Sequence, residues 1–130
     1  MKDIGLLVLR VFAGSFMLFA HGLQKLNMLF GPTEIKFSNP IGLGPELSLA
    51  LSAFAEFFCA GLLILGIFPR ISAGVLVINM FVAGIIFHAA DPFSTKEKAL
   101  LFLVIFVSLV LLGSGKYSLN KLFPAKFQKF

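Results

Sequence analysis

Four long stretches of almost uninterrupted apolar residues constrain this chain more than any other feature. They cover about residues 4–26, 47–68, 71–90 and 98–115. A transmembrane helix needs about 20 mostly apolar residues, and flanking lysines that reach toward the membrane surface extend a shorter one. One such stretch is compatible with a buried helix of a soluble protein, but four within 130 residues favour membrane spans. We therefore predict an all-α integral membrane protein, a single domain over residues 1–130 folded as an antiparallel four-helix bundle.

The composition agrees with membrane spans. Apolar residues make up 58% of the chain and charged residues 13%, whereas soluble domains have roughly 45–50% and about 25%. A single core of this size cannot hide so much apolar surface from water. This excludes a soluble enzyme, a disordered tail and a scaffold built on disulfides.

The distribution of positive charge predicts the orientation of the bundle. Four spans place both termini on one side, where the basic tail 116–130 also lies. That side carries seven lysines and arginines with Arg10 included, and the opposite side, which has the long outer loop 27–46, carries four. The four are Lys25, Lys36, Lys96 and Lys98. The positive-inside rule then places the termini in the cytoplasm. Because lysines alternate with phenylalanines in the tail, we expect an amphipathic segment on lipid and no nucleic-acid binding.

Two charged residues lie well inside the predicted spans, Arg10 in the first and Glu56 in the second. Charges within a membrane are costly, and they turn toward the bundle interior. At 1.5 Å of rise per residue, their depths differ by only about 7 Å. We therefore expect an Arg10–Glu56 ion pair. Two interpretations of that pair stay open: a structural clasp that fixes helix register, or a site for a polar head group such as a quinone carbonyl or a small anion.

Two histidines are expected near the outer surface of the membrane. His21 and His88 each lie seventeen residues into a span that starts on the terminal side, which places both about 25 Å up. With Gln24 and Lys25 they form a predicted outer-side polar cluster. They could hydrogen-bond to the loop, handle protons or contact a quinone ring, and no metal site is predicted. Asn79 precedes His88 by nine residues, about 900° of ideal helix rotation, so we expect the two to face opposite ways.

The single cysteine, Cys59, narrows the possible chemistry. A lone cysteine cannot form an intramolecular disulfide, which excludes a dithiol mechanism within this chain. We interpret its buried thiol as a packing group. The sequence has no phosphate-binding loop, dinucleotide fingerprint or zinc-ligand spacing. We therefore predict no self-contained active site and no intrinsic cofactor, and whether the chain is an enzyme stays open.

The order of these motifs resembles the DoxX family of small four-span membrane proteins. The first span has Leu-Arg-Val at 9–11 and His-Gly-Leu-Gln-Lys-Leu at 21–26. The second has Glu56 and then a glycine-rich stretch that closes at Arg70. Gly-Ser-Gly-Lys-Tyr-Ser-Leu ends the fourth at 113–119. These are similar to the family's arginine, its histidine-glycine-x-x-lysine ending, its glutamate and its G-x-G-[RK]-x-S-[LI] ending.

The resemblance implies a bacterial inner-membrane protein linked to redox chemistry. The family takes its name from a thiosulfate:quinone oxidoreductase, and other members are associated with thiol stress and with detoxification of quinones or catechols. By this analogy the polar positions that match are Arg10, His21, Lys25, Glu56 and His88. The implied partners are the lipid bilayer, quinone and redox proteins. If the chain belongs to an enzyme, the implied role is a quinone-linked oxidoreductase subunit.

Two alternatives to a quinone-linked subunit follow from the sequence. A non-enzymatic scaffold or chaperone would dock partner proteins through the tail or the outer loop, and the absence of cofactor motifs favours it. A small-solute transporter would have to form a homo-oligomer, at least a dimer, because four spans are few.

Overall fold

The computed structural model describes residues 1–31, 34–35, 37 and 39–130. Across these residues every regular element is a helix and none is a strand, which confirms the predicted all-α class. Lys36, one of the positive charges assigned to the outer side, lies outside the described residues.

The helices of the described chain join into four rods, followed by two short turns of 3-10 helix. The first rod comprises α1 (Lys2–Met17), η1 (Leu18–Gly22) and α2 (Leu23–Phe30). The second comprises α3 (Pro45–Ala53), η2 (Phe54–Cys59) and α4 (Ala60–Leu65). The third comprises α5 (Pro69–Phe81) and η3 (Val82–Phe87), and the fourth is α6 (Phe93–Leu112). The tail contains η4 (Leu119–Leu122) and η5 (Ala125–Phe127).

Prolines and glycines set the ends of these rods. Pro45 and Pro69 stand in the first turns of α3 and α5, where a missing N–H breaks no helical hydrogen bond. Gly66 ends α4 in the left-handed conformation, with φ of 74°. The rods differ from the expected spans at their ends because hydropathy marks only the apolar part of a helix. The first rod continues to Phe30, and α6 begins at Phe93 rather than near residue 98.

Three rods are long and apolar enough to cross a membrane. They are Lys2–Phe30, Pro45–Leu65 and Pro69–Phe87. The fourth rod, α6, has 20 residues, but Lys96, Glu97 and Lys98 lie in its first turns and shorten its apolar part. By length and composition the described helices therefore give three spans where four were expected.

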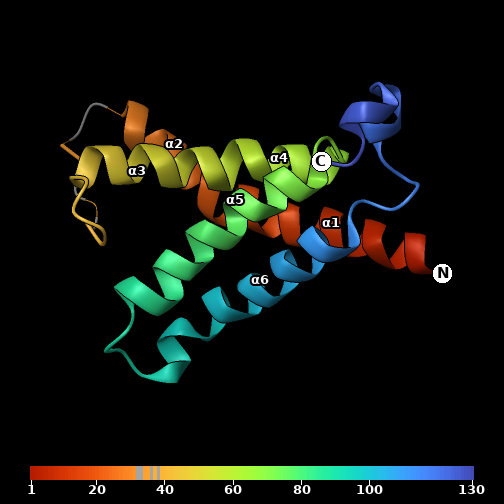
Figure 1. Cartoon of the computed structure of the whole chain (residues 1–130). Helices are drawn as coiled ribbons and strands as arrows, with labels where there is room; N and C mark the ends of the chain where they lie inside the picture. Colours follow the sequence, from red (N-terminus) through yellow and green to blue (C-terminus); the bar gives the residue numbers. More distant parts are fainter. Residues whose placement is uncertain (32–33, 36, 38) are drawn as a thin grey trace.

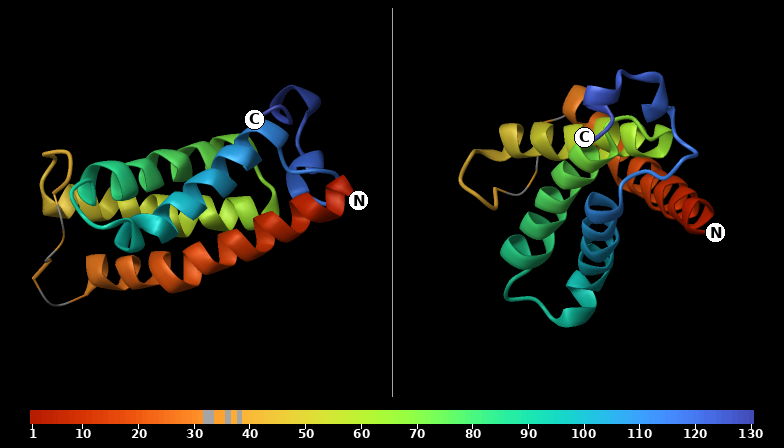
Figure 2. Two further views of the ribbon diagram at one scale, coloured as in Figure 1. Left: turned by 90° about the horizontal axis from the view of Figure 1, so that it is seen from below. Right: turned by 45° about the vertical axis from the view of Figure 1, so that its right-hand side comes forward.

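The rods run side by side, and both termini lie at one end of the molecule (Figure 2). We call this the terminal end, and the opposite end, where α2 ends and the α5–α6 connection lies, the loop end. Figure 1 shows α5 and α6 as a hairpin that diverges from α3 toward the loop end. Buried side chains from all four rods pack between them, among them Met17, Leu63, Leu76 and Phe106. Large apolar side chains also cover the outside, as lipid-facing helices require.

The tail folds back over the terminal end. The carbonyl oxygen of Phe130 accepts hydrogen bonds from the backbone N–H groups of Arg70 (2.7 Å) and Ile71 (2.9 Å). The rings of Phe68 and Phe123 pack with centroids 5.0 Å apart. Asn120 links the turn between α4 and α5 to the end of the tail. Its side chain accepts a hydrogen bond from Phe68 N and donates one to a carbonyl oxygen of the tail. These contacts hold residues 116–130 against the turn between α4 and α5.

Candidate functional site

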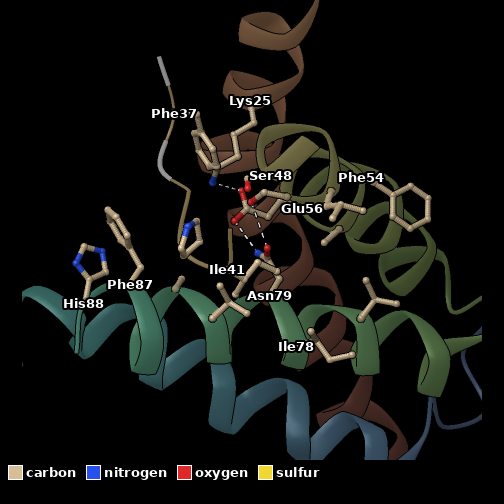
Figure 3. A pocket seen from close by; sticks show the side chains of 17 residues that line it. Lys25, Phe37, Ile41, Ser48, Phe54, Glu56, Ile78, Asn79, Phe87 and His88 are labelled. Atoms are coloured by element: carbon tan, nitrogen blue, oxygen red, sulfur yellow. Dashed lines mark hydrogen bonds and ion pairs between the residues drawn. The ribbon is translucent and has the colours of Figure 1, made fainter. Parts of the chain in front are cut away.

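A cavity of about 450 Å³ lies toward the loop end, between the rod of α3 and η2 and the rod of α5 and η3 (Figure 3). Most of its wall is apolar, and the described loop residues Phe37, Pro40 and Ile41 contribute to it. Phe54 and Phe87 add two further aromatic rings. Small-molecule sites in proteins have this size and this mostly apolar lining, with a few polar groups that orient the ligand.

A short row of polar side chains crosses the cavity wall (Figure 3). Lys25 Nζ forms an ion pair with Glu56 Oε2. The other carboxylate oxygen, Oε1, accepts a hydrogen bond from Asn79 Nδ2 at 2.8 Å. Asn79 Oδ1 in turn accepts from Ser52 Oγ at 3.2 Å. Three rods therefore supply one connected network, in which the buried Glu56 carboxylate is held from two sides.

Gly22 makes the Lys25–Glu56 pair possible. A Cβ atom built on Gly22 would lie 2.2 Å from the backbone oxygen of Glu56, so only glycine allows this close approach of the first two rods. Lys25 follows three residues later, on roughly the same face of the helix. The His-Gly-x-x-Lys pattern noted in the sequence thus has a packing role at its glycine and an ionic role at its lysine.

The polar residues lie in or beside segments of π-helix. His21 is in η1, Glu56 is in η2, and His88 follows η3 directly. Each π turn holds one residue more than an α turn and so changes the face that later residues present. As a result Asn79 and His88 both line the cavity. The expectation that they face opposite ways is wrong because it assumed an unbroken α-helix.

The mouth of the cavity is apolar. Leu51 and Phe54 line it and are about half exposed, and Ile78, also in the lining, is 66% exposed, so in a bilayer all three would face acyl chains. Nearer the loop end, His88 Nδ1 lies 2.7 Å from a carboxylate oxygen of the exposed Asp91. A ligand dissolved in the membrane could therefore enter the cavity laterally from the bilayer. It would then meet the row of polar side chains on the cavity wall.

The cavity brings together only part of the predicted outer-side cluster. Lys25 and His88 line it. His21 instead packs edge-on against Phe102 of α6, with ring centroids 6.3 Å apart, and Gln24 is exposed.

The structure corrects the expected Arg10–Glu56 ion pair. Glu56 is engaged by Lys25 and Asn79, while Arg10 donates to the carbonyl oxygens of Leu63 (3.5 Å) and Tyr117. Leu63 lies seven residues beyond Glu56, about 10 Å along the helix. Arg10 is fully buried at the last turn of α4, where the negative end of the helix dipole favours a cation and where Leu63 O also accepts from Gly66 N. Its Nε atom has no hydrogen-bond partner among the described residues.

Sequence reasoning missed the two serines of the site. Ser48, Ser52 and Glu56 are spaced by four residues, which places all three on one face of a helix, and all three line the cavity. That spacing of polar residues within an apolar span was the available signal. Cys59 packs in the buried core of the bundle. No group of three or more histidine, cysteine or acidic side chains in the described part of the chain could hold a metal ion.

The chemistry of the cavity is that of binding and orientation. Lys25 uses one of its three N–H donors on Glu56, which leaves donors for a ligand. Glu56 balances the charge of that lysine. The arrangement suits an uncharged ligand with an apolar ring and an acceptor oxygen, because the wall offers aromatic surface and the inner row offers hydrogen-bond donors.

A comparison with known protein families covers the residues of the polar row. A family model described as DoxX matches residues 5–89, which is more than half of the 130-residue chain. The matched part holds all four members of the polar row, and it confirms the resemblance seen in the motifs. Comparisons with curated proteins and with solved structures gave no match.

Proposed function

The chain belongs to the DoxX family, and from this premise we propose that it binds a membrane-soluble quinone as a membrane subunit linked to quinone or thiol redox chemistry or to detoxification. The observation that carries the proposal is the apolar cavity of about 450 Å³ with the Lys25–Glu56–Asn79 network on its wall. A quinone is an apolar ring with two carbonyl acceptors. The ring matches the apolar lining of the cavity. The carbonyl acceptors match the N–H donors of Lys25 that Glu56 does not use.

The roles of the residues follow from their places. Lys25 would donate to a carbonyl oxygen of the ring, and Glu56 with Asn79 would hold the lysine in position. Phe37 and Phe87 would pack against the ring. The half-exposed apolar residues at the mouth would let the quinone enter from the bilayer without crossing water.

The proposal also places the chain in a bacterial inner membrane with α6 as a fourth span and with both termini in the cytoplasm. Residues 99–112 of α6 carry no charge, and Lys98 can extend toward the membrane surface. The termini share one end of the bundle. Lys2 begins α1 there, the backbone of Arg70 donates to Phe130 O of the tail, and the tail carries four lysines. Positive charge of this kind favours the cytoplasmic side.

The test is equilibrium binding of a decyl-substituted benzoquinone to the purified chain in nanodiscs, with binding to empty nanodiscs subtracted. The variants are Glu56→Gln and Asn79→Leu, which disturb the network, and His21→Ala as a control outside the cavity. We expect saturable binding that weakens in the first two variants and changes little in the third. Binding equal to that of empty nanodiscs would refute the proposal.

A further inference from the structure

Ser48 carries a buried hydroxyl group that has no partner. The residue is 8% exposed, and its Oγ makes no hydrogen bond to any described part of the chain. Burying a hydroxyl group without a partner is unfavourable, so such a group needs an explanation. Ser48 also lines the cavity. The unused hydroxyl therefore belongs to the ligand space and not to a closed core.

Ser48 lacks the side-chain hydrogen bond that a helical serine commonly makes within its own helix. A serine in a helix commonly donates to the carbonyl oxygen four residues back, and Ser108 does so to Val104 at 2.9 Å. The equivalent oxygen for Ser48 is that of Gly44, which accepts from the backbone N–H of Ser48 at 3.0 Å. The side chain makes no such bond. Its hydrogen-bonding capacity remains available to a molecule in the cavity.

The neighbouring polar groups on this helix face are already engaged. Ser52, one turn along, donates to Asn79, and Glu56, two turns along, is held by Lys25 and Asn79. Ser48 is thus the member of this face whose capacity is wholly unused among the described residues. A hydroxyl group can donate one hydrogen bond and accept two.

We propose that Ser48 donates its hydroxyl hydrogen to a carbonyl oxygen of the ring bound in the cavity, and so selects rings that carry an acceptor oxygen. The inference rests on the proposed function, because it assumes that the cavity holds a quinone. The carbonyl of a quinone can only accept, so the serine must donate. A hydrocarbon ring of equal size would leave the hydroxyl unpaired, and it would bind less well.

The experiment compares two ligands and three serine variants in nanodiscs. The ligands are a decyl-substituted benzoquinone and decylbenzene, which has the ring and the chain but no oxygen. Ser48→Ala removes the donor, and Ser48→Thr keeps a hydroxyl group. Ser108→Ala is the matched control, since Ser108 is a partly exposed helical serine already bonded within its own helix. Circular dichroism of each variant checks that the helices remain folded.

Loss of one hydrogen bond should weaken quinone binding about three- to tenfold in Ser48→Ala. We expect Ser48→Thr to keep most of the affinity and Ser108→Ala to match the wild type. Decylbenzene should bind Ser48→Ala at least as tightly as wild type, because the alanine leaves no hydroxyl group unpaired beside the hydrocarbon ring. If Ser48→Ala binds the quinone as tightly as wild type, the role of Ser48 is overturned while the proposed function stands. If wild type binds no quinone, both are overturned.

Discussion

Gly22 lies directly against the backbone of Glu56. A Cβ atom on Gly22 would stand 2.2 Å from the Glu56 carbonyl oxygen and 2.8 Å from the backbone nitrogen of Phe57. The contact joins two π-helical segments, η1 and η2, and it brings the first rod close enough for Lys25 to reach the Glu56 carboxylate. A residue without a side chain therefore sets the geometry of the charged pair inside the bundle.

Replacing Gly22 with alanine should destabilise the bundle. The added methyl group meets backbone atoms, which cannot rotate away, so the two rods must separate. We expect a loss of about 1–3 kcal/mol in the free energy of unfolding, measured by denaturant-induced unfolding in detergent micelles. Gly74→Ala is the matched control, because a Cβ atom there meets nothing within 4 Å. Equal stability of Gly22→Ala and wild type would show that the contact is not needed.

The two members of the Lys25–Glu56 pair should respond unequally to substitution. The Glu56 side chain is 4% exposed, and that of Lys25 is 20% exposed. A lysine left alone can turn toward water, whereas a buried carboxylate left alone cannot. We therefore expect Lys25→Met to cost more stability than Glu56→Gln, by unfolding in detergent micelles.

A double-mutant cycle tests whether the Lys25 and Glu56 side chains interact in the folded protein. The Lys25→Met, Glu56→Gln double variant should lose less stability than the sum of the two single losses, by about 0.5–3 kcal/mol. Additive losses would mean that the two side chains do not interact in the folded protein.

Arg10 should control the tail and not the cavity. Its donors reach the carbonyl oxygens of Leu63 and Tyr117, and it does not line the cavity. We expect Arg10→Met to speed tryptic cleavage at the tail lysines and to leave quinone affinity within about twofold of wild type. Asp3→Asn is a milder second variant, because Asp3 accepts a hydrogen bond from Lys116 N at 3.1 Å. Loss of quinone binding with an intact tail would instead favour the discarded Arg10–Glu56 pair.

The sequence predicts the helical class and the location of most of the apolar helices because long apolar stretches leave few alternatives. It also singles out Lys25, Glu56 and His88, which line the cavity. It assigns the wrong partner to Arg10, because depth along a helix says nothing of the direction that a side chain takes around it. A backbone carbonyl group at the end of α4 accepts a hydrogen bond from the guanidinium group. Counting charged residues in the sequence does not reveal such a backbone partner.

The rest of the site depends on π turns that the sequence does not mark. Simple rotation at 100° per residue separates Asn79 from His88, yet η3 brings both to one cavity. Ser48 and Ser52 could be identified in the sequence by their four-residue spacing from Glu56. Their significance becomes visible only once the opposite rod, with Asn79, is in place.

Photoaffinity labelling with an azido-substituted benzoquinone in nanodiscs tests most directly whether the cavity is the binding site. Labelled peptides are identified by mass spectrometry with and without excess unlabelled quinone. We expect competed labels at Leu51, Phe54, Ile78 and Val82, which line the cavity. Labels spread over lipid-facing residues outside it, such as Phe12, Phe16 and Phe58, and not reduced by competitor would contradict a quinone site between the second and third rods.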